Sequence, residues 1–179
     1  MAPASTADIV SFPTFAKPVP REQFIDAMGQ AVTGVTIITT SGGAGRAGIT
    51  VSAVSSVTAD PPLLLACMHR DSPACEKVRR NGIFCVNVLK DSHSAVADVF
   101  AGRGQRDVFE SKFDCTLWGS LVTGAPAMGD ALAVFDCRPQ TSQVVGSHRV
   151  FFGIVVGTRT SEGVPLLYAS RAYGRPQWG

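Results

Sequence analysis

Short runs of β-branched and apolar residues, separated by turn residues, recur along this chain and constrain its fold more than any other feature. Six runs lie at 35–40, 49–57, 63–68, 83–89, 131–137 and 150–158, and a seventh candidate lies at 165–169. Runs of this length and composition are typical of strands. The chain does not alternate strands with long helices as a doubly wound sheet requires. The pattern therefore predicts a mainly β protein whose antiparallel strands close into a barrel, which removes exposed sheet edges.

Only a few short helices fit between these strands. The segment 20–29 predicts an amphipathic helix that follows a proline and ends at a glycine. A second helix is predicted to begin at Ser72-Pro73, as N-cap and first helical residue, and to end at Asn81-Gly82. A third helix is predicted over about 92–101, with Gly102 as its C-cap.

The composition fits one compact domain and a narrow range of partners. The chain has 179 residues, 45% hydrophobic and 17% charged, and we expect a flexible arm (1–19) followed by one domain (20–179). The net charge is +2 and the basic residues are scattered, so we expect small molecules or proteins as partners, and neither nucleic acid nor membrane. Neither a signal peptide nor a membrane span of about 20 apolar residues is expected.

The cysteines and histidines predict neither disulfides nor a metal site. Five cysteines, an odd number without a C-x-x-C pair, favour a protein of the reducing cytoplasm. Cys67, Cys85 and Cys137 lie in apolar runs, where a thiol usually acts as a small buried hydrophobic group. The three histidines lack metal-ligand spacing. We interpret the cysteines as structural.

A glycine-rich stretch from Gly43 to Gly48 matches G-x-G-x-x-G after a predicted strand. A dinucleotide-binding motif of this kind needs a helix directly after it, whose N-terminus meets the pyrophosphate. Residues 49–57 are instead rich in β-branched residues. The stretch is therefore predicted to be a hairpin loop.

A row of hydroxyl groups follows this loop. Thr50, Ser52 and Ser56 share one parity of the predicted strand 49–57, so their side chains would point to one face. Such a row fits a solvated strand face as well as it fits a set of donors that meets a polar ring edge or a phosphate.

Three further features each have an ordinary and a functional interpretation. Arg70 and Ser72 stand at the start of the second predicted helix, where they form either an anion site or an N-cap beside a surface arginine. The segment 100–103 with Phe109 and Phe113 either covers a planar ligand or packs onto the barrel. His148 precedes a strand, where a histidine is usually a surface residue.

Six segments taken together resemble the flavin reductase family. They are TGVTIIT (33–39), GITVSAVSSVTADPPLLLAC (48–67), FCVNVL (84–89), FAGR (100–103), GSHRVFFGIV (146–155) and PLLYASRAYGR (165–175). They extend over nearly the whole chain in the order typical of the family. This family includes the short-chain reductases that supply reduced flavin to two-component aromatic monooxygenases.

The resemblance implies a fold and a reaction. It implies a mainly β fold, the FMN-binding split β-barrel with a few short helices, in a homodimer with the flavin at or near the subunit interface. The implied activity is hydride transfer from NADH or NADPH to FAD or FMN, with release of reduced flavin to a flavin-dependent monooxygenase of aromatic degradation. The cofactors carry the electronic work of this step, so the protein's task is to position them.

The resemblance also implies the residues of the site. His148 would lie on the nicotinamide side, within a motif whose middle residue in the family is aspartate and here is Ser147, which puts in doubt any role that needs a carboxylate to orient the imidazole. The implied flavin contacts are Thr50, Ser52, Ala53, Ser55, Ser56, Arg70, Ser72, Phe100, Ala101, Gly102, Arg103, Phe113, Arg171 and Tyr173.

Two other functions stay open at this stage. One is a non-catalytic flavin- or haem-binding protein of the same fold, because fold does not determine function. The other is an FMN-dependent oxidase of a small substrate, although the sequence shows no extra basic cluster for a phosphorylated substrate. The residues do not decide between FAD and FMN or between NADH and NADPH.

Overall fold

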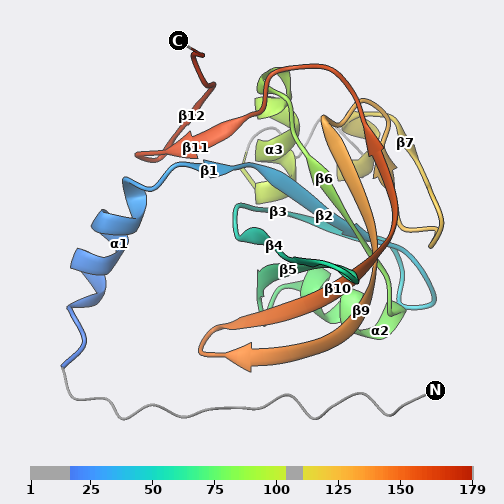
Figure 1. Ribbon diagram of the computed structural model, residues 1–179, viewed down its shortest axis with the longest axis horizontal. Helices are drawn as coiled ribbons and strands as arrows, with labels where there is room; N and C mark the ends of the chain where they lie inside the picture. The colour runs from blue at the N-terminus through green and yellow to red at the C-terminus, as the bar shows by residue number, and fades with distance from the viewer. Residues whose placement is uncertain (1–16, 104–110, 179) are drawn as a thin grey trace.

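The computed structural model describes residues 17–103 and 111–178, and its centre is a seven-stranded antiparallel sheet rolled into a barrel (Figure 1). The strand order is β3-β2-β6-β9-β10-β5-β4. The strands are β2 (Thr36–Thr40), β3 (Ala47–Val51), β4 (Val54–Ala59), β5 (Pro62–His69), β6 (Phe84–Val88), β9 (Ala133–Val145) and β10 (His148–Thr160). The mainly β barrel predicted from the sequence is confirmed, and the glycine-rich stretch is the turn of the β2–β3 hairpin.

The segment 49–57 is not one strand, and this prediction was wrong. β3 and β4 follow each other in the chain but lie at opposite edges of the seven-stranded sheet, joined by Ser52 and Ala53. The backbone turns at this link, where Val54 N–H donates to the Ser52 carbonyl (3.1 Å) and Cys67 N–H donates to the Ala53 carbonyl (2.9 Å). The sheet is therefore rolled up by a two-residue connection, and its two edge strands do not pair with each other.

Three helices have the positions expected from their caps. They are α1 (Arg21–Gly29), α2 (Pro73–Asn81) and α3 (Ser94–Ala101), with 3₁₀ turns η1 (Asp91–His93) before α3 and η3 (Lys112–Cys115) after the gap in the described chain. The Ser72 hydroxyl accepts a hydrogen bond from Cys75 N–H (3.1 Å), and Gly82 ends α2 at a φ of 67°. Gly102 ends α3 in the same left-handed conformation.

Short strands outside the barrel were mostly missed by the sequence patterns. β1 (Thr33–Gly34), β11 (Leu167–Ala169) and β12 (Ala172–Gly174) form a three-stranded sheet, in which only β11 corresponds to a predicted run. β7 (Trp118–Gly119) pairs with β8 (Ala127–Met128). Two-residue strands are too short to produce an alternating pattern.

Two apolar clusters stabilise the barrel from inside and from outside. Inside, Phe84 of β6 and Phe151 of β10 pack with Val78 of α2, and all three are at most 1% exposed. Outside, Phe100 of α3 packs in the cluster that includes Ile37 of β2 and covers the other face of the sheet. β2 is buried along its whole length, which explains why its residues form a continuous run rather than an alternating one.

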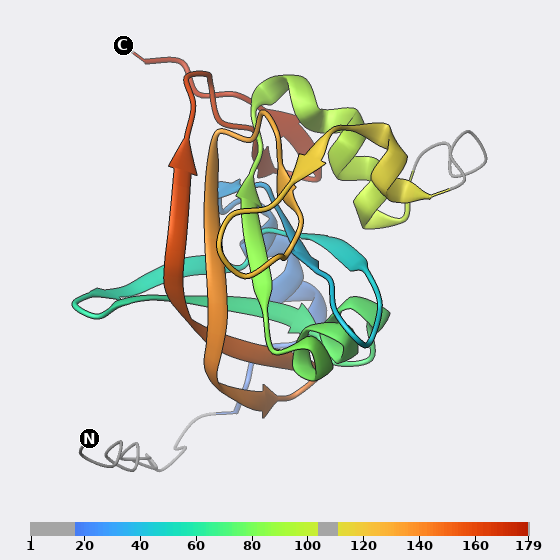
Figure 2. The same ribbon diagram turned by 90° about the vertical axis from the view of Figure 1, so that its right-hand side faces the viewer.

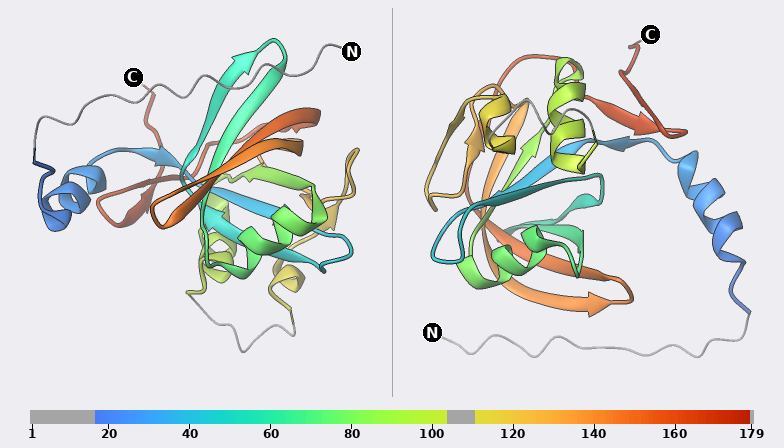
Figure 3. Two further views of the ribbon diagram at one scale, coloured as in Figure 1. Left: turned by 90° about the horizontal axis from the view of Figure 1, so that it is seen from below. Right: turned by 180° about the vertical axis from the view of Figure 1, so that it is seen from behind.

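Two parts of the chain stand apart from this core. α1 has no buried residue, and its Phe24 and Met28 are 57% and 52% exposed, so its apolar side chains face solvent in the described chain. The views of Figure 1 and Figure 3 show this helix beside the barrel, connected through β1. The β4–β5 hairpin projects from the barrel in Figure 2. Residues 1–16 of the expected arm lie outside the described residues.

All five cysteines are free thiols. Cys85 and Cys137 are fully buried, and Cys67 is half-buried. Burial raises the pKa of Cys137 to about 12, and it raises the pKa of Cys85 as well. No helix among the described residues is long and apolar enough to cross a membrane.

Gly153 is required by the packing inside the barrel. A Cβ atom at Gly153 would lie 2.5 Å from the Phe84 ring and 3.2 Å from Cys137 Cβ. We expect Gly153→Ala to lower the free energy of unfolding by about 1–3 kcal/mol, because an extra carbon overpacks a filled core. In thermal unfolding this corresponds to roughly 2–4 °C per kcal/mol. Gly34→Ala is the control, since nothing lies within 4 Å of its Cβ, and equal melting temperatures for the two variants would contradict the prediction.

Candidate functional site

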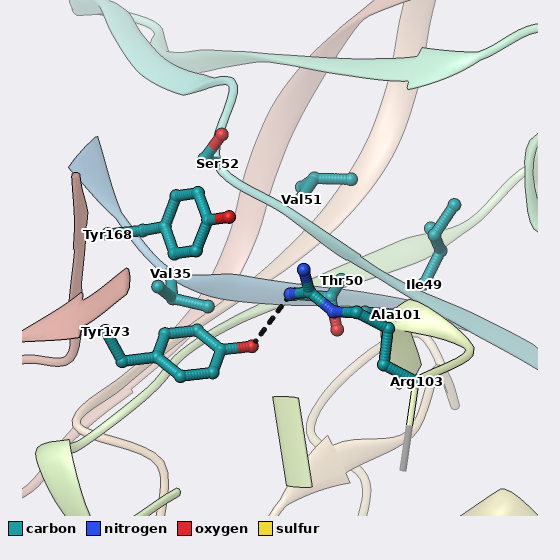
Figure 4. Close-up of a pocket in the computed structure, with 9 residues that line it drawn as sticks. All are labelled: Val35, Ile49, Thr50, Val51, Ser52, Ala101, Arg103, Tyr168 and Tyr173. Carbon is teal, nitrogen blue, oxygen red and sulfur yellow. Dashed lines mark hydrogen bonds between the residues drawn. The ribbon is translucent and has the colours of Figure 1, made fainter. Parts of the chain in front are cut away.

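A pocket of about 370 Å³ opens between β3, the end of α3 and the small C-terminal sheet (Figure 4). Strand β3 is an edge strand, and no described strand pairs with its outer edge, so backbone groups there can meet a ligand. We call this cavity the tyrosine pocket. Its lining is Val35, Ile49, Thr50, Val51, Ser52, Ala101, Arg103, Tyr168 and Tyr173.

One wall of the tyrosine pocket is polar and aromatic. The rings of Tyr168 and Tyr173 lie edge to face, with centroids 5.5 Å apart. Arg103 Nη2 donates to the Tyr173 hydroxyl (3.2 Å), as Figure 4 shows. Burial and a hydrogen bond to Asp98 raise the pKa of Tyr173, so this phenol is protonated at neutral pH. The wall can therefore offer a guanidinium, phenol groups and ring faces to a planar polar ligand.

The opposite wall is fixed by a bond between β3 and α3. The Thr50 hydroxyl donates to the Ala97 carbonyl (2.7 Å), which joins the edge strand to the helix. Gly48, earlier in the same strand, is buried, and a Cβ there would lie 2.5 Å from the Phe100 ring. The close approach of strand and helix thus depends on glycine at this position.

A second pocket, of about 580 Å³, continues the first along β3 toward α2. The two pockets share Ile49 and Ala101, so they form one groove. Among its described lining residues are three cationic side chains and no carboxylate, and we call it the cationic pocket. Its lining is Arg46, Ala47, Gly48, Ile49, Ser72, Pro73, Ala74, Lys77, Phe100, Ala101, Gly102, Ser111, Lys112 and Phe113.

The cations of this pocket are held in place by backbone and ring contacts. Lys77 Nζ donates to the Arg46 carbonyl (3.2 Å), and Lys112 Nζ donates to the Gly48 carbonyl (3.2 Å). The Arg46 guanidinium stacks 3.9 Å above the centre of the Phe113 ring. Burial lowers the pKa of Arg46, but a guanidinium remains charged at neutral pH. Together with the N-terminus of α2, these groups suit a phosphate-bearing ligand.

The structure brings most of the sequence-predicted residues to this groove. Those in the tyrosine pocket are Thr50, Ser52, Ala101, Arg103 and Tyr173. Those in the cationic pocket are Ser72, Phe100, Ala101, Gly102 and Phe113.

The hydroxyl groups of Thr50, Ser52 and Ser56 do not lie on one face of one strand, contrary to the prediction from the sequence. Because the strand breaks at Ser52, Ser55 and Ser56 lie on β4 in a separate, mostly apolar pocket of about 580 Å³ beneath the projecting hairpin. Ala53 is exposed at the link itself. In one chain these residues therefore do not line the groove along β3.

Three further predicted residues line neither pocket. Arg70 is exposed, and its side chain donates to the Gly146 carbonyl (3.3 Å). His148 is exposed at the start of β10, opposite His69 of β5, with ring centroids 5.5 Å apart. Arg171 lies in the turn between β11 and β12, 3.6 Å from Asp26 of α1.

Phe100 and Phe113 pack onto the barrel rather than forming a free cover. Their rings lie 5.1 Å apart and contact Trp118, and they are 2% and 6% exposed. Their edges reach the cationic pocket from this packed position. Phe109 lies outside the described residues.

Sequence reasoning missed several groups of the groove. Arg46 stands in the glycine-rich turn between β2 and β3, where a single basic residue forms no pattern that marks a ligand site. Lys77 lies four residues after Pro73, one helical turn away on the same face of α2, a spacing that could have identified it. No sequence signal marks Tyr168 or Asp98. The described residues hold no cluster of three or more His, Cys, Asp or Glu side chains that could bind a metal ion.

Comparison with known proteins matches this chain to a protein family. The model of the flavin reductase like domain matches residues 28–177. The FMN reductase (NADH) RutF of Ancylobacter novellus is 43% identical over 159 residues, which are 88% of this chain and 86% of that protein.

Solved structures agree with this match. Nitrilotriacetate monooxygenase component B from Mycobacterium thermoresistibile is 31% identical with a TM-score of 0.79, and the match covers 88% of this chain and 87% of that one. The NADH:FAD oxidoreductase SgcE6 of Streptomyces globisporus, solved with NAD and FAD fragments, is 27% identical with a TM-score of 0.79, and the match covers 90% and 98%.

Proposed function

Because the chain belongs to the family of flavin reductase-like domains, we propose that it reduces free flavin with NADH in the groove along β3 and releases the product to a partner enzyme. It is an NAD(P)H:flavin oxidoreductase. The observation that carries the proposal is the continuity of the tyrosine pocket with the cationic pocket, because a flavin nucleotide joins a planar ring system to phosphate. One solved relative is named as a component of a monooxygenase. Another is named as an NADH:FAD oxidoreductase.

The residues present fit a flavin. Tyr168, Tyr173 and Arg103 would hold the edge of the ring system, which carries carbonyl and N–H groups. Lys77 and Lys112 would hold the phosphate. Flavin and NADH, when bound, supply the hydride chemistry, and the protein's part is to bind both and set their separation.

His148 would contact the nicotinamide nucleotide where it extends beyond the two pockets. The support is its place in the Gly146-Ser147-His148 motif, together with its exposed position. The Ser147 hydroxyl lies 3.0 Å from Nδ1 of this imidazole, in the place where the family has a carboxylate. Because a hydroxyl stands there and no carboxylate, this residue would act as a hydrogen-bonding contact.

The partner enzyme would be a flavin-dependent monooxygenase component. One solved relative is named as a component of such a system, for nitrilotriacetate. This substrate is not aromatic, so a role in aromatic degradation stays a prediction. The five free thiols agree with a reducing compartment such as the cytoplasm.

We propose a homodimer for this protein. The support is apolar surface in two places, on α1 with exposed Phe24 and Met28, and on the β4–β5 hairpin, where Val57 is 47% exposed above an apolar pocket. A partner subunit that covered the hairpin would also bring Ser55 and Ser56 near a ligand. Light scattering of the purified protein is expected to give twice the chain mass, and a monomer at micromolar concentration would contradict the proposal.

The activity itself is tested by the flavin dependence of NADH oxidation. We expect the purified, flavin-free protein to oxidise NADH only when micromolar FMN or FAD is added, with a rate that saturates in flavin. A non-catalytic flavin- or haem-binding protein would keep its cofactor and show no such stimulation. An oxidase of a small substrate would need that substrate for turnover.

The phosphate contact is tested by removing one charge from the cationic pocket. We expect Lys77→Gln to raise the KM for FMN about tenfold, the effect of about 1.4 kcal/mol, with little change in kcat. Riboflavin lacks the phosphate, so its KM should not change. Arg80→Gln removes the same charge from the same helix outside the pocket and serves as the control. An equal rise in KM for riboflavin would show that Lys77 acts on the structure and not on phosphate.

The nicotinamide contact is tested at His148. We expect His148→Ala to lower kcat/KM for NADH roughly ten- to a hundredfold, the size of one or two good hydrogen bonds. The KM for flavin is the internal control and should change little. Wild-type NADH kinetics in this variant would show that His148 is a surface residue without a role.

A further inference from the structure

Asp98 lies behind the tyrosine pocket and does not line it. Its Oδ1 accepts a hydrogen bond from the Tyr173 hydroxyl (2.9 Å) and lies 3.4 Å from Arg103 Nε. Arg103 Nη2 in turn donates to the Tyr173 oxygen (3.2 Å). The three side chains thus form a closed triangle with one carboxylate oxygen at its base.

This triangle fixes the direction of each hydrogen bond. The Tyr173 hydroxyl has one proton, and Asp98 accepts it, so the phenol oxygen can only accept from Arg103. The guanidinium uses one Nη2 hydrogen within the triangle, its Nε is in ionic contact with Asp98, and it also forms a hydrogen bond with the Tyr168 side chain. A guanidinium has five N–H groups, so others remain for a ligand in the pocket, toward which Figure 4 shows the guanidinium extending.

The triangle also joins three separate parts of the chain. Asp98 lies on α3, Arg103 follows the Gly102 cap of that helix, and Tyr173 lies on β12 near the C-terminal end. Arg103 N–H donates to the Asp98 carbonyl (2.8 Å), so the backbone holds the loop in the same place. More than half of the Arg103 side chain is exposed, and the carboxylate is the group that ties both this side chain and the Tyr173 hydroxyl to α3.

The charge of the triangle distinguishes this pocket from its neighbour. Asp98 compensates the charge of Arg103, so the tyrosine pocket presents oriented donors with little net charge. The cationic pocket has three cations and no carboxylate among its described lining residues. An uncharged ring edge with carbonyl acceptors matches the first pocket, and a phosphate matches the second.

We propose that Asp98 is a positioning residue that holds Arg103 and Tyr173 in the geometry needed to bind the uncharged ring edge of the flavin. This inference rests on the proposed function, because it assigns the ring to the tyrosine pocket. It adds a residue that touches no ligand and acts through two others. Asp98 thereby also sets which end of the flavin enters which pocket.

The first test needs no flavin. The chain has only two tyrosines, Tyr168 and Tyr173, so the phenolate absorbance can be titrated with base and resolved into two steps. A nearby carboxylate disfavours phenolate, and its removal in Asp98→Asn should move one step to lower pH. Tyr173→Phe identifies which step belongs to Tyr173. Asp91→Asn, which removes a carboxylate paired with Arg175 just before α3, should leave both steps in place.

The second test measures binding of riboflavin, which has the ring and lacks the phosphate. Fluorescence quenching without NADH should show that Asp98→Asn weakens riboflavin binding about fivefold, and FMN binding by the same factor. In turnover the KM for flavin should rise by that factor while kcat changes less than twofold. In the Tyr173→Phe/Arg103→Ala background, Asp98→Asn should have no further effect, because the residues it positions are gone.

The outcomes separate the inference from the function on which it rests. Unchanged riboflavin binding in Asp98→Asn, or an undiminished effect in the double-variant background, overturns the inference while flavin reduction by the wild type stands. Absence of flavin-dependent NADH oxidation in the wild type overturns the proposed function, whatever the titration gives. If Asp98→Asn melts at the same temperature as Asp91→Asn, a general loss of structure is excluded as the cause of its effects.

Discussion

The connection of Ser52 and Ala53 transfers the chain from one edge of the barrel sheet to the other, and the candidate site depends on this transfer. β3 pairs with β2 on one side only, and no strand among the described residues pairs with its other edge. α3 is joined to β3 by the bond between Thr50 and Ala97. Directly after the link, β4 runs at the opposite edge of the sheet, so its residues line a different pocket and leave the groove to β3, α2 and α3.

The two ends of the groove differ in charge, because different elements of the fold border them. At one end, the small C-terminal sheet brings two tyrosines beside an arginine whose charge is compensated by Asp98. At the other end, α2 and the turn before β3 bring cationic side chains to a helix N-terminus, and no carboxylate lines the pocket among the described residues. A ligand with a neutral ring and a charged tail therefore has one favourable orientation. The barrel itself supplies no charged group here, and serves to fix the distance between the two ends.

The sequence allowed the barrel, its main strands and the caps of α2 and α3 to be predicted, because each depends on local propensity. It did not reveal the break at Ser52, since β-branched residues continue on both sides of the link and no proline or glycine marks it. It also did not reveal the polar half of β9, residues 138–145, which pairs with β10 in an exposed ribbon. Such pairing is decided by the partner strand and not by apolar residues.

The candidate site was predictable in part for a similar reason. Residues in contiguous motifs, such as Thr50, Ala101 and Arg103, were found by resemblance and lie together in the structure. Lys112 and Asp98 were not found, because their roles come from tertiary contacts between distant segments. His148 and Arg171 match family motifs but lie outside the groove of a single chain. A motif identifies a residue type at a position, and the neighbours that give it a role are set by the fold.

Burial of the cysteine thiols affects how the protein resists oxidation in air. Free reduced flavin reacts with oxygen and gives hydrogen peroxide, so the proposed release of this product would expose the protein to an oxidant that its own reaction generates. Peroxide attacks the thiolate form of cysteine, which leads to sulfenic and then irreversible acids. Burial keeps Cys85 and Cys137 in the neutral thiol form and out of contact with solvent. The packing that closes the barrel thus also protects these two thiols from oxidation.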